Sequence, residues 1–171
     1  PELPRIQCRT PDREEFEHIR QTRQVLSHLG LQDAVTYSFV PAELLRSLSM
    51  EKDTVRIANP LNAERATLRT TLLAGLLENQ RRAASRYIPS FHQFEVARTY
   101  HAREGNPLPE EVLRVAALLH GPRPSFFNEA GVFDFYDARG LVEQLCAMLS
   151  TCPPTFTPAA RPYLHDRRCC E

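Results

Sequence analysis

The chain has 171 residues, of which 42% are hydrophobic and 25% charged, with 21 basic and 21 acidic side chains. This length suits a single domain, and the apolar fraction excludes wholesale disorder. Net neutrality argues against a protein that holds nucleic acid by bulk charge. No apolar run approaches the roughly 20 residues of a membrane span. The five cysteines lack a framework spacing, which indicates reduced thiols in the cytoplasm.

Hydrophobic spacing predicts alternating helices and strands along the chain. Apolar residues at helical spacing mark the helices, and period-two alternation marks the strands. The clearest alternation places Val35, Tyr37 and Phe39 on one side of a strand. In chain order, the expected elements are a linker over residues 1–11, helices over 12–30, 41–48, 71–86 and 136–149, and strands over 34–40, 54–58, 90–100, 113–119 and near Phe156.

The order of these elements indicates the fold class. The connections are too irregular for repeated βαβ units, which favours an α+β fold with a mainly antiparallel sheet flanked by helices. The last helix is expected to bury four apolar side chains, Leu141, Val142, Leu145 and Met148. Residues 12–171 are expected to form one core domain. Because the chain opens on proline rather than methionine, we expect it to be a piece of a longer protein.

Few residues indicate catalysis by themselves. Phosphate-binding glycine loops, nucleophile elbows and zinc spacings are absent from the sequence. Asp134 and Asp137 could hold Mg²⁺, but acids at a helix start are stabilised by the helix dipole, and this structural interpretation is favoured. Glu95 is expected to face solvent or to pair with a neighbour such as Arg98. His165 could act as a general base, although a lone histidine near a terminus is more often structural.

A basic edge lies on the leucine-rich helix over residues 71–86. It consists of Arg81, Arg82 and Arg86, and it could contact phosphate. The favoured interpretation is a solvated helix face, because charged residues on the outer side of an amphipathic helix need no partner.

Six short blocks follow one another over nearly the whole chain. They are Pro1-Glu2-Leu3-Pro4, residues 26–33 with Thr36-Tyr37-Ser38-Phe39, Asn59-Pro60-Leu61 with Leu68-Arg69-Thr70, Phe94-Glu95-Val96, Asp134-Phe135-Tyr136-Asp137 with Gly140, and Leu164-His165. In this order they resemble the central core of the β subunit of bacterial phenylalanyl-tRNA synthetase. The sequence departs from the family pattern at Ala97, Arg139 and Asp166-Arg167.

The resemblance implies a class II aminoacyl-tRNA synthetase catalytic domain without its active site. The whole enzyme joins phenylalanine to tRNA(Phe) using ATP and Mg²⁺, in a cytoplasmic α₂β₂ assembly in which α is catalytic. This segment is therefore expected to have no catalytic, cofactor-binding or metal-binding residue and no contact with a membrane. Where an active class II site needs an arginine for ATP, the alignment places His101. Because the family's core continues further, the domain is expected to be truncated at its C-terminus.

The resemblance also predicts where the chain meets the α subunit. In class II synthetases the first-motif helix and strand, here residues 14–30 and 35–39, form the subunit contact. Part of the leucine stripe is expected to join this seam; the alternative is that these apolar stripes belong to the chain's own core. The predicted interface residues are Phe16, Ile19, Val25, Leu26, Leu29, Val35, Tyr37, Leu72 and Leu76. The motif residues expected to be structural are Asn59, Pro60, Leu61, Leu68, Arg69, Phe94, Glu95, Asp134, Phe135, Gly140 and His165.

Two other functions stay open at this point. An independently active class II adenylating domain would use its own arginines to hold ATP. An RNA-binding module would bind tRNA by itself, with an affinity that falls steeply with salt, and the neutral charge argues against it.

Overall fold

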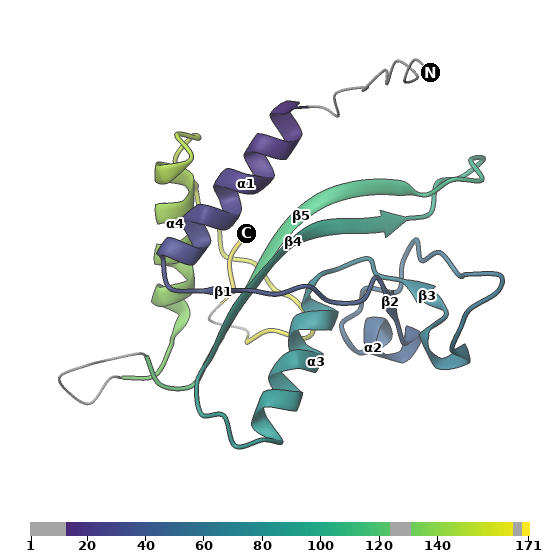
Figure 1. Ribbon diagram of the computed structural model, residues 1–171, viewed down its shortest axis with the longest axis horizontal. Coiled ribbons are helices and arrows are strands. Elements are labelled where there is room, and N and C mark those ends of the chain that lie inside the picture. Colours follow the sequence, from purple (N-terminus) through teal and green to yellow (C-terminus); the bar gives the residue numbers. More distant parts are fainter. Residues whose placement is uncertain (1–12, 124–130, 166–168) are drawn as a thin grey trace, which may run out of the picture.

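The computed structural model describes residues 13–123, 131–165 and 169–171, so the predicted linker over 1–11 lies outside the described residues. The predicted helices over 12–30, 41–48, 71–86 and 136–149 are confirmed, as are the long strands over 90–100 and 113–119. In chain order (Figure 1), the elements are α1 Arg13–His28, β1 Gln32–Asp33, β2 Phe39–Val40, α2 Ala42–Ser47, the 3₁₀ helix η1 Ala63–Arg65, β3 Thr67–Leu68, α3 Leu73–Ala84, β4 Phe91–His101, β5 Glu110–His120 and α4 Phe135–Met148.

A long antiparallel hairpin of β4 and β5 forms the centre of the fold. The two strands pair over their full length, with Phe91 opposite His120. β1 lies on the other side of β4 and pairs with it in parallel, with Gln32 beside Gln93. β2 and β3 form a separate two-stranded sheet. The α+β class is confirmed, but the expectation of a mainly antiparallel sheet is corrected to a small, mixed one.

Only the two ends of the strand expected over residues 34–40 form backbone hydrogen bonds to these sheets. Its Ala34 N–H donates to the carbonyl of Phe94 at 2.8 Å. The Thr36 N–H, however, donates to the side chain of Glu95 at 3.1 Å instead of to a strand carbonyl. Because its middle bonds to a side chain, this segment does not continue as a long antiparallel strand.

Helices cover both faces of the β4–β5 hairpin. α1 and α4 lie side by side (Figure 1). On this face the buried side chains of Leu26, Leu31, Phe94 and Val96 pack together, and we call them the first core cluster. α3 lies against the other face, where the Asn79 side chain donates to that of Gln93 at 3.3 Å. Successive residues of β4 therefore point alternately toward α1 and toward α3.

A second core cluster joins α2 to α3. It consists of the buried residues Val40, Leu45, Leu48 and Ala74. α2 begins directly after Pro41, which lacks an N–H and so suits a helix start. Across the described part of the chain, the helices are too short or too polar to cross a membrane.

Two of the predicted short strands are wrong. Residues 54–58 form only an isolated bridge, between Arg56 and Thr67, because β3, beside which they lie, is only two residues long. Near Phe156 the described residues likewise contain only an isolated bridge, between Pro158 and Cys170.

The buried face of α4 is narrower than predicted. Leu141 and Leu145 pack against the first core cluster, as expected. Val142 and Met148 are exposed, which corrects the prediction that they are buried. The helix contacts α1 and the hairpin along one stripe, and the other two side chains lie outside that stripe.

Candidate functional site

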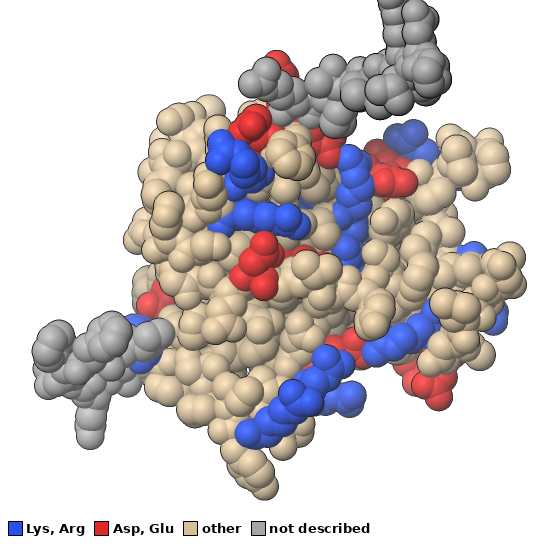
Figure 2. All heavy atoms as spheres, in the orientation of Figure 1, with Lys and Arg blue, Asp and Glu red and all other residues tan. Residues whose placement is uncertain are grey.

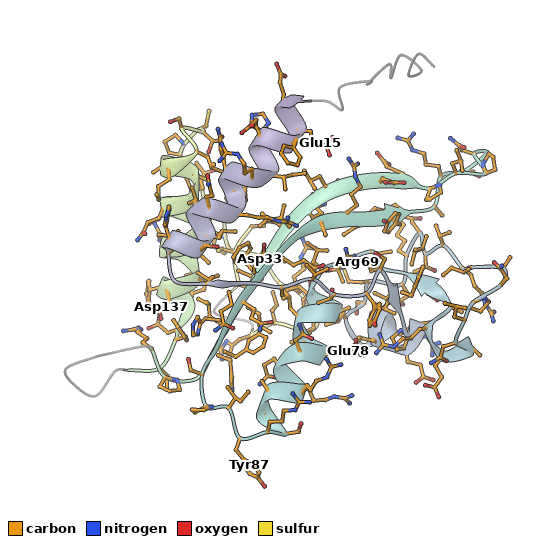
Figure 3. The ribbon with its side chains drawn as sticks, viewed as in Figure 1. Glu15, Asp33, Arg69, Glu78, Tyr87 and Asp137 are labelled. Carbon is orange, nitrogen blue, oxygen red and sulfur yellow. The ribbon has the colours of Figure 1, made fainter. Side chains whose placement is uncertain are left out.

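Three of the six sequence blocks meet at a buried ion pair. Arg69 follows β3 and Glu95 lies in the middle of β4; Nη1 of the arginine is 2.8 Å from Oε1 of the glutamate, and the two side chains are 4% and 2% exposed. The Thr36 hydroxyl donates to Oε2 of Glu95 at 2.7 Å. We call Thr36, Arg69 and Glu95 the Arg69 junction. Figure 3 shows Arg69 between the hairpin and the beginning of α3.

Further hydrogen bonds tie Arg69 to the surrounding backbone. Its Nε donates to the carbonyl of Arg98 at 3.0 Å, and its Nη1 donates to the Thr36 hydroxyl oxygen at 3.0 Å. The Arg69 N–H donates to the carbonyl of Ser38, and the Arg69 carbonyl accepts from the Tyr100 N–H, both at 2.9 Å. Arg69 therefore connects the extended segment before β2 to the C-terminal half of β4.

The geometry of the junction stabilises the fold. Both carboxylate oxygens of Glu95 accept bonds from protein groups, so the charge is compensated inside the chain. Removing one partner of such a pair leaves an uncompensated buried charge, at a cost of about 3–5 kcal/mol.

The expected pairing of Glu95 with Arg98 is corrected. Residues 95 and 98 point to opposite faces of β4, and Arg98 bonds to Glu15 of α1 instead.

Gly75 of α3 lies against the Arg69 junction, a contact that was not predicted from the sequence. A Cβ atom at this position would lie 2.2 Å from the Oγ1 atom of Thr36, so α3 approaches the junction only because residue 75 has no side chain. An isolated glycine within a leucine-rich helix is the signal that could have indicated this contact. Gly140 of α4, by contrast, has open space where its Cβ would be.

The opposite side of the same extended segment is apolar and exposed. Val35, Tyr37 and Phe39 are 87%, 77% and 42% exposed, and we call them the exposed row. Tyr37 and Phe39 border an open hollow of about 260 Å³ that Asn59-Pro60-Leu61 and Arg65 complete. Contiguous apolar surface of this kind is typical of protein–protein interaction sites.

The structure divides the nine predicted interface residues by burial. The three exposed residues are Phe16, Val35 and Tyr37. Two are partly buried and pack against the first core cluster, namely Ile19 and Leu29. The four residues buried inside the chain are Val25, Leu26, Leu72 and Leu76. The four buried residues have almost no surface with which to meet a partner, because the chain's own helices and sheet enclose them. These four residues lie in the chain's own core.

The acidic pair at the start of α4 caps this helix. The Asp134 carboxylate accepts from the Tyr136 and Asp137 N–H groups at 2.8 and 3.2 Å, and the Asp137 carboxylate accepts from the Asp134 N–H at 2.7 Å. This last bond, together with the Arg123 guanidinium, holds the pKa of Asp137 below its usual value of 3.8. The structural interpretation of the pair is confirmed. Among the described residues, no group of three His, Cys, Asp or Glu side chains could hold a metal ion.

The remaining motif residues lie on separate elements. Leu68 lies in β3, Phe94 is fully buried in the first core cluster, and Phe135 begins α4. His165 is exposed close to the C-terminal end of the described chain. His101 is the last residue of β4, and its Nε2 lies 3.1 Å from the hydroxyl oxygen of Thr99.

The chain matches a known protein family over its whole length. Residues 1–171 match the family model described as the phenylalanyl tRNA synthetase beta chain CLM domain. The phenylalanine–tRNA ligase beta subunit of Geobacter metallireducens is 31% identical over 160 residues, which cover 89% of this chain and 20% of the relative. The corresponding subunit of Moorella thermoacetica is 35% identical over 153 residues, with coverages of 85% and 19%. The chain thus spans about a fifth of the length of these curated relatives.

A solved structure shares the fold at low sequence identity. The pyrrolysyl tRNA synthetase of Desulfitobacterium hafniense matches with a TM-score of 0.61 and 12% identity, over 86% of this chain and 48% of that chain. The likeness shows that most of this chain shares the fold of that tRNA synthetase. The match over residues 1–171 shows that the chain belongs to the family of the phenylalanyl tRNA synthetase beta chain CLM domain.

Proposed function

We propose that this segment is a non-catalytic structural core of a phenylalanine–tRNA ligase β subunit and that its exposed row packs against the catalytic α subunit. One observation carries the proposal: Val35, Tyr37 and Phe39 face outward, while the polar Thr36 between them bonds to the buried Glu95. A partner that removes this row from water gains about 25 cal/mol per Å² of apolar surface.

The hollow beside the row gives this contact its shape. Tyr37 and Phe39 form one wall, and Asn59-Pro60-Leu61 forms the other, with Leu61 fully exposed. An apolar side chain of the α subunit fits such a concave surface, as anchor residues do at protein interfaces. The exposed Phe16 of α1 supplies a second, smaller contact.

Three residues of types that could hold ATP or Mg²⁺ already have partners within the chain. Arg69, the buried arginine beside the hairpin, already bonds to Glu95 and Thr36, and Asp134 and Asp137 already cap α4. On this proposal the α subunit binds ATP and Mg²⁺, the whole α₂β₂ enzyme binds tRNA(Phe) in the cytoplasm, and residues 12–171 form the class II-like core of β.

Copurification of the two full-length subunits tests the proposal. The double substitution Val35→Asp and Tyr37→Asp places two charges in the exposed row, and we expect it to abolish copurification with α. Leu108→Asp is the matched control, because Leu108 is an exposed apolar residue in the loop between β4 and β5. Retention of α by the double variant would contradict the proposed interface.

A second measurement tests the absence of catalysis. The full-length β subunit, freed of α, is expected to show no phenylalanine-dependent exchange of pyrophosphate into ATP. Robust exchange would support an independently active adenylating domain instead.

A further inference from the structure

The C-terminal end of α3 carries a basic and aromatic surface that the contacts above do not use. It consists of Arg81, Arg82, Arg86 and Tyr87, all exposed, which we call the α3 tip. Figure 2 shows basic side chains grouped over the lower part of α3. Figure 3 shows Tyr87 projecting beyond the end of the helix.

Glu43 and Glu78 line a hollow together with Arg81 of the α3 tip but form no ion pair with it. Among the residues described, none of its three arginines forms an ion pair. Glu78, the acidic residue of α3, pairs with Arg65 at 2.7 Å. Arg82 and Arg86 are four residues apart, a spacing at which like charges on a helical turn repel each other. The helix dipole favours cations at this end and explains the arginines in part.

The helix dipole does not explain Tyr87. The Tyr87 N–H donates to the Ala84 carbonyl at 3.0 Å, and the Ile88 N–H donates to the Ala83 carbonyl at 3.1 Å, which together close α3 in a Schellman motif. Tyr87 occupies the left-handed position of this motif, with φ +56°, where glycine is the usual residue. Its side chain is 94% exposed, so packing within the described chain does not compensate the strain.

We infer that the α3 tip binds the backbone of tRNA, with its arginines on phosphates and the Tyr87 ring stacked on an unpaired base. The guanidinium group matches phosphate oxygens with paired hydrogen bonds. Exposed aromatic rings are the usual platforms for unstacked bases. An acidic protein segment would satisfy the arginines but would offer the ring no flat partner. The inference rests on the proposed function, in which tRNA is the RNA that the whole enzyme binds.

Binding of labelled tRNA(Phe) transcript to the full-length α–β assembly, measured over a range of salt concentrations, tests the inference. Replacing Arg82 and Arg86 together by Gln is expected to reduce the slope of log affinity against log salt by about 1.4–1.8, since two phosphate contacts are lost. Arg114→Gln is the matched control, because Arg114 is an exposed arginine of β5 outside the tip, and it should leave the slope unchanged.

The Tyr87→Gly variant distinguishes a role of Tyr87 in tRNA binding from a role in the stability of the fold. Glycine suits the left-handed position, so the melting temperature should stay the same or rise, while tRNA binding weakens about 5- to 100-fold through loss of stacking. Tyr87→Phe keeps the ring and should bind like the parent. A purely structural tip predicts the same stability gain with no change in binding.

The outcomes distinguish this inference from the proposed function. Unchanged affinity and salt slope in the tip variants, with α still bound, would overturn the inference alone. A change in subunit assembly without a change in tRNA affinity would also overturn it, and would indicate that a protein covers the tip. If the parent subunit does not retain α, the proposed function fails, and the same titrations on the full-length β subunit alone still test the tip.

Discussion

Residues 35 to 39 present two faces with opposite chemistry and opposite surroundings. The side chain of Thr36 turns inward to the buried pair of Arg69 and Glu95. The side chains of Val35 and Tyr37 point outward and are largely exposed. The usual arrangement, with the apolar face inside and the polar face outside, is therefore reversed in this segment.

The reversal shows what each face does. The inner face is fixed by directional bonds that are complete within the chain, so it holds the segment in place. The outer face consists of apolar surface without directional bonds, so it suits a partner that covers it. Substitutions on the two faces test this division.

Replacing Glu95 by Leu should destabilise the chain by about 3–5 kcal/mol, because Arg69 is left as an uncompensated buried charge. Adding Arg69→Met should recover much of this loss, since it removes the second charge. Urea unfolding of the two single variants and of the double variant gives the free energies of a double-mutant cycle. Additive effects of the two substitutions would show that the pair is not coupled.

Gly75→Ala tests the close approach of α3 to the inner face. The added methyl group would collide with Thr36, and overpacking of this kind costs about 1–3 kcal/mol. Gly140→Ala in α4 is the matched control, because nothing lies near its Cβ position, and it should stabilise the helix by about 0.5–1 kcal/mol. Equal effects at the two glycines in urea unfolding would refute the steric account.

Two isosteric substitutions at neighbouring positions compare the faces directly. Thr36→Val removes the hydroxyl that bonds to Glu95 and should cost about 1–3 kcal/mol. Val35→Thr makes the reverse change on the exposed face and should shift stability by no more than about 0.5 kcal/mol. Thermal unfolding of both variants measures the contrast. A larger loss for Val35→Thr would reverse our assignment of the faces.

The smallest effect concerns pH. The pKa of Asp137 is lowered in the folded chain, first by the bond from the Asp134 N–H and then by Arg123. A lowered carboxyl pKa contributes stability above the unfolded value of about 3.8, and this contribution is lost as the pH falls through the folded pKa. The stability difference between the parent and Asp137→Asn should therefore shrink below about pH 4. Urea midpoints from pH 3 to 7 check this, and a constant difference would contradict it.

Local patterns in the sequence predicted much of this fold. Helical spacing located α1, α3 and α4, and the acids at residues 134 and 137 indicated the start of α4, because such signals depend only on nearby residues. The alternation over residues 34–40 was also correct as a pattern. The blocks that resemble the family indicated the synthetase fold.

The long-range contacts could not be read from these patterns. The partner of Glu95 is 26 residues away, and the choice between Arg69 and Arg98 depends on which face of β4 each one meets. Nor could alternation alone tell which face of residues 35–39 is buried, because the ion pair reverses the usual preference. The burial of Leu72 and Leu76 follows from the packing of α3 on the hairpin, which a leucine stripe alone does not specify.

Hydroxyl-radical footprinting of the α–β assembly, without RNA, tests the central claim most directly. Tyr37 and Tyr87 are the same residue type and are 77% and 94% exposed in this chain, so each serves as a reference for the other. If the exposed row packs against α, Tyr37 will be oxidised several-fold more slowly than Tyr87. Equal oxidation rates of the two tyrosines in the assembly would contradict the claim that a partner covers the outer face.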